Sequence, residues 1–566
     1  MASTADPRDL LGVLAKSVTA EISALSSWPC YSRPTGASSW YNRSRTLRRP
    51  VPFLILLDFL FRFMSSNEIT SRTIGPLWFI ILMPLSACAA LVGVAAYNYY
   101  PTIALVAIGC PLIAVGAWWL LQSPYRCMCA LVAMLPLEAS AVLEIGFTLR
   151  LAYVMIVLLS VSTWRCADEL GVPRSPALKP LAFFALVCVV STAQLIIWPP
   201  PPTPSLQSTL EMRGSAMRVF VQLFLLAIHV MLFVNVLAVV RSKFRIRTAI
   251  QIFVVTALLV ATYALYQPVA VTYNLPLKDI TNAIATSGNR FGGVLYSGGL
   301  VSIRPRATFQ EAGNLGQFLL AALAILFVYN PFVGGTRKVA HYAAISLLTW
   351  SLIATLARGS YVGWMAAMVA MVLAGAKRAI SRQIAVSGLA LAVFVVVVFP
   401  MIGLTNADDI SFLATVVERF SGDPSSQERL KSGSVLFDVW TDHPILGVGF
   451  GAYGAYGASL TNASILLSAN GVWWSVLAET GIIGFCVFCW FVATLLLGAF
   501  RGYHSCRDPE LKAIIGGLGA AVVGVLTQYL FIGDRMTSFV WFLLALLAAA
   551  TSTAKNRSKR AERTEK

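Results

Sequence analysis

The feature that most constrains this chain is a series of long apolar runs. Most of them are about 17–25 residues long, the length a helix needs to cross a hydrocarbon core roughly 30 Å thick. Only 12% of the 566 residues are charged and 57% are hydrophobic, a balance that cannot cover the surface of a soluble protein of this size. Because lipid offers no hydrogen bonds to the backbone, the runs must be helices. The sequence therefore predicts an all-α polytopic membrane protein.

The hydropathy pattern predicts about fourteen transmembrane helices within a transmembrane domain at residues 76–553. Residues 1–75 are predicted to be a cytoplasmic N-terminal tail that includes an interfacial helix, and residues 554–566 a basic cytoplasmic tail. The third and fourth spans are the least regular, because charged residues interrupt them. The predicted spans lie near residues 76–97, 102–121, 127–143, 149–164, 180–198, 217–240, 247–269, 314–332, 339–356, 360–376, 384–404, 472–499, 512–532 and 536–553.

The distribution of basic residues predicts the orientation of these spans. With both termini in the cytoplasm, the inner segments contain 31 of the 43 Lys and Arg residues, as expected from the excess of positive charge on cytoplasmic loops. Two outer connections are then long, near residues 270–313 and 405–471. Loops of that length are usually functional, so we expect the site to lie among them.

Neither the cysteines nor the histidines predict a cofactor site. Most of the ten cysteines lie inside apolar runs, where cysteine packs as a small hydrophobic side chain. No His/Asp cluster is present, so we expect no metal and no other cofactor. The sequence GFGAYG, within residues 442–457, matches a dinucleotide-binding pattern literally but lacks the strand–turn–helix context that the pattern requires. It instead predicts a sharp turn or a close approach of backbone to a ligand.

Arginines gather in or beside the two long outer loops. At the end of a helix an arginine can extend its side chain to the lipid headgroups or pair with a nearby acid. Arg358 fits that interpretation poorly, because it lies in a tight turn between apolar spans with no neighbouring acid and should have an anionic partner. Several guanidinium groups together can hold a diphosphate. We predict that Arg306, Arg358 and Arg429 converge on a lipid-linked phosphate at the outer surface, with Arg304 and Arg290 as further substrate-binding residues.

Two polar residues of the second loop complete the predicted site. His443 is the only histidine on the outer side, and Asn470 lies at the head of the twelfth span, where it could also be a plain N-cap. Nine residues further along, Glu479 is deep enough that burial without a partner would be costly.

Four segments resemble the bacterial O-antigen ligase and polysaccharide polymerase superfamily. They are RATFQEAGNLGQFL, TLARGSYVGW, ERLKSGSVLFDVWTDHPILGVGFGAYG and NGVWWSVLAETGIIG, which together span roughly residues 290–500. The resemblance implies a class C membrane glycosyltransferase in the bacterial inner membrane that uses no metal or nucleotide sugar. Such an enzyme moves a glycan from undecaprenyl diphosphate to an acceptor hydroxyl on the periplasmic face with inversion. The resemblance also implies that Arg306 and Arg358 contact the diphosphate.

The chain departs from the ligase pattern at one position. Ligases generally carry a histidine–asparagine pair where this chain has Asn470 and Gly471. The absence of that histidine favours a repeat-unit polymerase over a ligase, and it leaves the general base unassigned. The candidates for the base are Asp438, Asp442 and Glu311, of which Glu311 is preferred as a catalytic residue because it is close to Arg306.

The expected partners are the lipid-linked glycan, an acceptor glycan, the bilayer and a chain-length regulator, with no nucleic acid. Two other functions fit a polytopic chain. A transporter or flippase should contain internal repeats or paired broken helices, and we find no repeat between the halves of the sequence. A purely structural membrane subunit would not need arginines beside its outer loops.

Overall fold

Most of the predicted spans that the structure describes form helices. A computed structural model describes residues 115–137, 140–144, 148–171, 173–197, 215–278, 280, 294–297, 300–332, 337–374, 434–461, 471–533 and 537–565. The predicted N-terminal tail, the spans near 76–97 and 384–404, and most of the span near 102–121 lie outside these residues.

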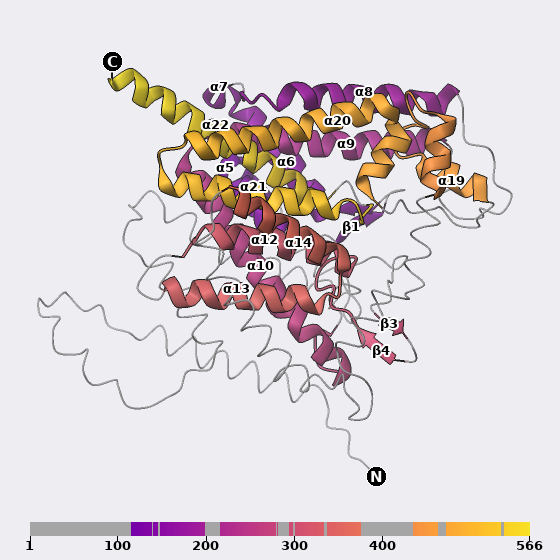
Figure 1. The fold of residues 1–566 in the computed structure, drawn as a ribbon, viewed down its shortest axis with the longest axis horizontal. Helices are drawn as coiled ribbons and strands as arrows, with labels where there is room; N and C mark the ends of the chain where they lie inside the picture. Colours follow the sequence, from indigo (N-terminus) through magenta and orange to yellow (C-terminus); the bar gives the residue numbers. More distant parts are fainter. Residues whose placement is uncertain are drawn as a thin grey trace, which may run out of the picture. The chain divides into compact units, whose positions relative to one another are not determined.

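Thirteen helices have bounds within the described residues (Figure 1). They are α5 (Pro124–Met134), α6 (Leu151–Arg165), α7 (Ala167–Leu170), α8 (Leu178–Ile197), α9 (Ser215–Val239), α10 (Lys243–Thr272), α12 (Ala312–Val328), α13 (Arg337–Ala354), α14 (Arg358–Leu373), α19 (Tyr453–Thr461), α20 (Val472–Ser505), α21 (Pro509–Gln528) and α22 (Ser538–Glu565).

Five described segments are long and apolar enough to cross a membrane. They are Phe220–Val239, Lys243–Thr272, Val472–Ser505, Pro509–Gln528 and Ser538–Arg557. Four shorter apolar helices accompany them, at Leu151–Arg165, Leu178–Gln194, Ala312–Val328 and Arg358–Leu373. The chain is therefore a helical membrane protein, in agreement with the class predicted from its sequence.

Two short antiparallel hairpins lie between the helices of this mostly helical fold. Strand β1 (Ala141–Glu144) pairs with β2 (Thr148–Arg150), and β3 (Val294–Ser297) pairs with β4 (Leu300–Ile303). The predicted span near residues 127–143 was wrong, because α5 ends at Met134 and the chain enters β1 instead. Pro136 explains the early end, since proline supplies no backbone N–H and its ring obstructs the preceding turn of a helix.

Helix α12 is the most enclosed helix of the described bundle. Fifteen of its 17 residues are buried, and both α12 and α14 pack extensively on α21. Small residues permit the close approach, which is typical of helix packing in membranes. A side chain at Gly363 would collide with the Gly524 carbonyl, and one at Gly316 would collide with Ser360. The N-terminal ends of α12 and α14 are thereby held next to the C-terminal end of α21.

An ion-pair network joins helices at the end of the bundle where α21 begins. Asp508 caps α21 by accepting hydrogen bonds from the backbone N–H groups of Glu510 and Leu511. Lys243 is the first residue of α10, and its Nζ lies 2.9 Å from Asp508 Oδ2 and 2.7 Å from Glu510 Oε2. Partial burial opposes ionisation, but the hydrogen bonds from Lys243 and Leu511 lower the pKa of the Asp508 carboxyl. The network therefore joins α10 to α21 through ion pairs between charged side chains.

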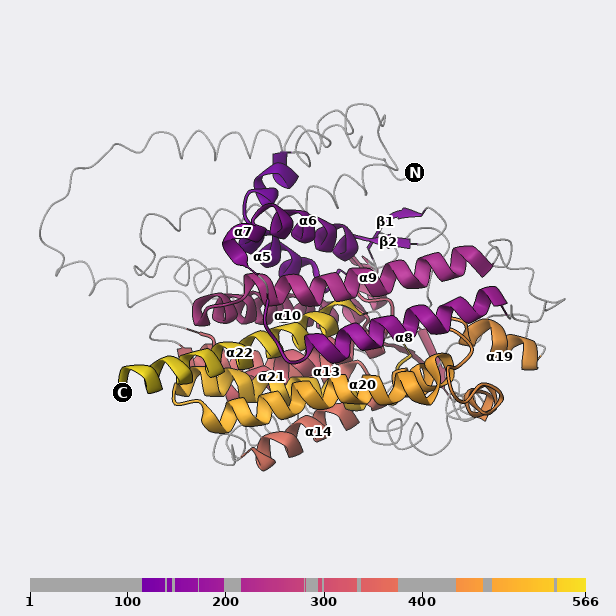
Figure 2. The same cartoon turned by 90° about the horizontal axis from the view of Figure 1, so that it is seen from above.

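The hairpins and α19 lie at the opposite end from the C-terminus of α22. Figure 1 shows β1, β3, β4 and α19 on the right and the end of α22 on the left, and Figure 2 shows the same separation for β1, β2 and α19. The segments predicted to be outer loops therefore gather at one end of the helices.

Candidate functional site

Arg306 lies in a short loop whose backbone is held by a side chain of α10. The loop follows β4, and Arg306 is only 4% exposed. The side-chain oxygen of Gln267, a buried residue of α10, accepts hydrogen bonds from the backbone N–H groups of Arg306 (3.0 Å) and Ala307 (2.9 Å). Ala307 has a φ of 48°, a conformation that costs an ordinary residue free energy unless its surroundings impose it. Gln267 is the group that holds this turn.

Three neighbours hold the rest of the loop. The Thr308 hydroxyl donates to the Pro136 carbonyl at 2.6 Å, and the Arg150 guanidinium donates to the Gln310 side-chain oxygen at 3.1 Å. Phe309 is fully buried against Phe318 of α12. The loop therefore bridges the segment after α5, the start of α6 and the start of α12, which makes it a rigid element.

Arg304 joins this loop to the turn that precedes Arg358. Its Nε donates to the Thr355 carbonyl at 3.0 Å and its Nη2 to the Leu356 carbonyl at 3.3 Å. These carbonyls follow the last residue of α13, where backbone acceptors lack helical partners. Arg358 is half-buried and is the first residue of α14. The two arginine-bearing segments, about fifty residues apart in sequence, are therefore neighbours in space.

The other predicted site residues are placed less closely or not described. Glu311 is exposed at the N-cap position of α12, where its side chain makes no capping hydrogen bond. His443 is half-buried, and its ring contacts that of Tyr456 with the centroids 5.8 Å apart. Asp438 and Asp442 are exposed. The predicted site residues outside the described part of the chain are Arg290, Arg429 and Asn470.

The glycine-rich segment after His443 docks against a break in α20. Gly481 has φ 64° and ψ −169°, which interrupts α20 near its start. The N–H groups of Val448 and Gly449 donate to the carbonyls of Ala478 (3.1 Å) and Glu479 (3.0 Å), and the N–H of Ile482 donates to the Pro444 carbonyl (2.9 Å). The loop therefore supplies backbone partners on both sides of the break.

Glu479 has the partner that its predicted depth requires. The residue is 3% exposed, and its Oε2 accepts a hydrogen bond from the N–H of Gly451 at 2.8 Å. The Ser191 hydroxyl of α8 donates to the Leu446 carbonyl at 2.9 Å and to the Glu479 carbonyl at 2.5 Å. Glu479 thus fastens the glycine-rich loop to α20.

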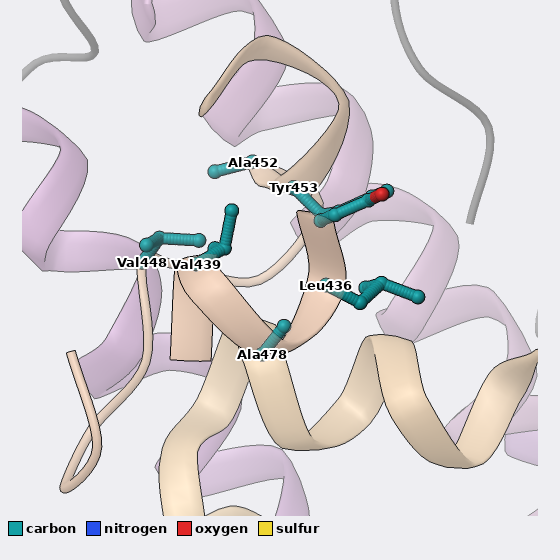
Figure 3. Packing of buried hydrophobic residues seen from close by; sticks show 6 residues of the cluster. All are labelled: Leu436, Val439, Val448, Ala452, Tyr453 and Ala478. Atoms are coloured by element: carbon teal, nitrogen blue, oxygen red, sulfur yellow. The ribbon is translucent and has the colours of Figure 1, made fainter. Parts of the chain in front are cut away.

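A small apolar core supports the same docking. It comprises Leu436, Val439, Val448, Ala452, Tyr453 and Ala478, all buried, and Figure 3 shows them facing one another between residues 434–442, the glycine-rich loop and the first part of α20. Residues 434–442 and α19 form local helices within the second long loop. These elements form a compact unit on the end of α20.

Gly481→Ala is expected to destabilise the protein strongly. A methyl group there would collide with the carbonyl of Ile445, and the backbone conformation itself costs an L-residue about 1–3 kcal/mol. Gly498→Ala is the matched control, because a methyl group at that helical position meets nothing within 4 Å. Thermal unfolding in detergent should show a much lower midpoint for Gly481→Ala only. Equal midpoints for the two variants would contradict the docking described above.

The described part of the candidate site brings two arginine-bearing segments together. Among the residues that the structure describes, no group of three His, Cys, Asp or Glu side chains could hold a metal ion. Arg306 and the turn before Arg358 are brought together at one end of the bundle by hydrogen bonds. Sequence reasoning missed Gln267, the amide that fixes the loop, because a single glutamine within an apolar run carries no signal of its partner.

Comparison with known proteins found a family that matches part of the chain. The O-antigen ligase family model matches residues 343–489, a range that includes Arg358, the glycine-rich loop, Glu479 and the break in α20. Arg306 lies outside the matched range. No curated protein matches the chain. The family supports an O-antigen ligase-like or polymerase-like function, of the membrane glycosyltransferase kind. Residues 343–489 of the chain are thus similar to the O-antigen ligase family, and this match supports a relation to the O-antigen ligase and polysaccharide polymerase superfamily.

Proposed function

We propose that the chain polymerises lipid-linked polysaccharide repeat units of an exopolysaccharide, a capsule or an O-antigen. In this proposal the donor is a glycan on undecaprenyl diphosphate, and the acceptor is a sugar hydroxyl of another glycan. The reaction takes place at the periplasmic face of the bacterial inner membrane, beside the two long outer loops. A chain-length regulator is the expected protein partner.

The observation that carries the proposal is the link between the two arginine-bearing segments. The Arg304 side chain donates to the Thr355 and Leu356 carbonyls, and so brings the loop with Arg306 beside the turn with Arg358. Two guanidinium groups at one site suit a diphosphate, whose oxygens accept parallel hydrogen bonds from each fork. The N-terminus of α14 adds a partial positive charge on the same side.

The proposed reaction is an inverting transfer without a metal. The acceptor oxygen forms a bond to the anomeric carbon while the bond from that carbon to the diphosphate oxygen breaks. Negative charge then grows on the departing undecaprenyl diphosphate, where Arg306 and Arg358 stabilise it. The acceptor proton passes to a general base. Glu311 is our choice for that base, because its side chain is exposed, makes no capping hydrogen bond and lies five residues from Arg306.

Polymerisation is preferred to ligation because the chain lacks the histidine of the histidine–asparagine pair that ligases carry at the positions of Asn470 and Gly471. Asn470 stands where that pair has its histidine, and Gly471, with a φ of 140° that side chains rarely adopt, stands where it has its asparagine. A ligase that transfers the glycan to lipid A-core is the alternative, and a transporter or flippase is a weaker one. His443, Arg290, Arg429 and Asn470 stay predicted substrate contacts.

The cell-surface polysaccharide of a deletion strain tests the function. Loss of long polymer with retention of single repeats is the result expected for a polymerase. Unmodified lipid A-core together with accumulated lipid-linked polymer would instead identify a ligase. An unchanged polysaccharide profile, with no lipid-linked intermediate accumulating, would overturn both assignments.

Cysteine labelling tests the proposed orientation. Leu277 and Leu460 are exposed and lie in the two long outer loops, whereas Ser505 is exposed in an inner connection. Single cysteines at 277 and 460, in a background without native cysteines, should react with an impermeant maleimide in intact spheroplasts. A cysteine at 505 should react only after lysis. The reverse pattern would invert the topology and exclude a periplasmic site.

A further inference from the structure

Gln528 joins the ends of three helices at the base of the candidate site. It is the last residue of α21 and is completely buried. Its Nε2 donates two hydrogen bonds, one to the Gly313 carbonyl of α12 at 3.0 Å and one to the Ser360 hydroxyl of α14 at 2.8 Å. A single side-chain amide therefore connects α12, α14 and α21.

The two partners lie directly beyond the residues that the proposed function uses. Gly313 is the second residue of α12, two positions after Glu311, and Ser360 is the third residue of α14, two positions after Arg358. Arg304, in the loop before α12, makes hydrogen bonds to the turn before Arg358. The segments at the starts of α12 and α14 are thus connected twice, by the side chain of Arg304 and by that of Gln528.

The packing around Gln528 leaves its side chain little freedom. A methyl group at Gly363 would lie 3.3 Å from the Gln528 Cβ, and one at Gly359 would lie 3.5 Å from its Cγ. A methyl group at Gly316 would collide with Ser360 itself. Glycines at these positions let the three helices come close enough for one amide to reach both partners. Closely packed interiors transmit small displacements instead of absorbing them.

We propose that Gln528 is a positioning residue for the transfer reaction. It sets the separation of the α12 and α14 ends, and through them the distance between the loop that carries Arg306 and the first turn of α14 that carries Arg358. It does not touch the substrate. The inference rests on the proposed function, because it assumes that both arginines act on one diphosphate.

A merely structural role would give a different result in a paired substitution. Gln528→Leu keeps the volume but leaves the buried Ser360 hydroxyl without its donor, so it should lower stability. Replacing both partners by apolar groups is often nearly neutral for stability, so Ser360→Ala combined with Gln528→Leu should recover most of the unfolding temperature. If Gln528 positions the helix ends, activity should stay low in the double variant although its stability returns.

The activity test uses the full chain in lipid nanodiscs with an undecaprenyl-diphosphate-linked repeat unit. We expect Gln528→Leu and the double variant to lose about a hundredfold in kcat/KM, the order of effect produced by a misplacement near 1 Å. The matched control is Gln251→Leu, because Gln251 also donates to a backbone carbonyl, that of Pro331 at 2.9 Å, away from the site. Recovery of activity together with stability in the double variant would overturn the proposal.

A distance measurement separates this inference from the proposed function. Spin labels at positions 311 and 365, both exposed, report the separation between the N-cap of α12 and the middle of α14. The distance distribution should shift or broaden in the double variant and stay unchanged in Gln251→Leu. An unchanged distribution in the double variant would refute positioning whether or not the protein is active. A wild-type protein that is inactive on lipid-linked repeats would instead refute the proposed function.

Discussion

Arg306→Ala should abolish detectable long polymer in a complemented deletion strain, at membrane expression equal to the wild type. Departure of the diphosphate builds negative charge at the site, and a fixed cation there is expected to contribute about 3–4 kcal/mol, or roughly a hundredfold to a thousandfold in rate. The substitution leaves the loop anchored, because Gln267 bonds to the backbone N–H groups of residues 306 and 307 and needs no side chain at 306. A large loss of activity at matched membrane expression is the result expected from removal of the charge.

Arg304→Ala is the matched comparison, and a smaller loss is expected. The Arg304 side chain donates to two backbone carbonyls, so the main effect of its removal should be to loosen the turn before Arg358. Polymer should become shorter or less abundant but should persist. If Arg304→Ala and Arg306→Ala were equally tolerated, the diphosphate would have to be held elsewhere and this loop would be an ordinary connection.

The sequence predicted the helices well because apolar runs determine where the chain can lie in lipid. The predicted span at 180–198 is α8 (Leu178–Ile197), and the one at 472–499 is the larger part of α20 (Val472–Ser505). The ends differ because polar caps extend a helix beyond its apolar run. Ser242, for example, accepts a hydrogen bond from the Arg245 N–H and so begins α10 before the predicted span at 247–269.

The contacts that build the site were less predictable, because each joins residues far apart in the chain. The depth of Glu479 predicted a costly burial, but its partner is the N–H of Gly451, 28 residues earlier, and only the docked loop shows this. Gln528 has no signal in the sequence VLTQYLF, since its partners Gly313 and Ser360 belong to two other helices. Hydropathy predicts which segments are buried but not which polar groups meet there.

The prediction for the glycine-rich sequence was correct in kind and incomplete in detail. A sharp turn with close backbone approach was expected, and Gly447, Gly449 and Gly451 do have positive φ values of 70°, 107° and 86°. The approach is to the chain's own helix α20 rather than to a ligand, because the carbonyls of Ala478 and Glu479 accept the loop's N–H groups. The break at Gly481 exposes these carbonyls to the loop, and nothing in the periodicity of an apolar run marks such a break.

Arg358→Lys tests whether Arg358 acts through its charge or through its shape. Lysine keeps the positive charge but replaces a planar fork of donors by a single ammonium group. If Arg358 holds two diphosphate oxygens through parallel hydrogen bonds, lysine cannot reproduce the geometry. A side chain that only reaches for lipid headgroups would be replaced by lysine with little effect.

We expect Arg358→Lys to reduce polymer yield at least tenfold at matched membrane expression, and Arg358→Ala to reduce it further. Arg358 begins α14 directly after the turn that Arg304 holds. Arg337→Lys is the control, because Arg337 is an exposed residue at the start of α13, and it should behave as wild type. Wild-type yield from Arg358→Lys with loss only in Arg358→Ala would mean that charge alone suffices. That result would exclude bidentate hydrogen bonding of Arg358 to the diphosphate. A cation beside the leaving group would still be required.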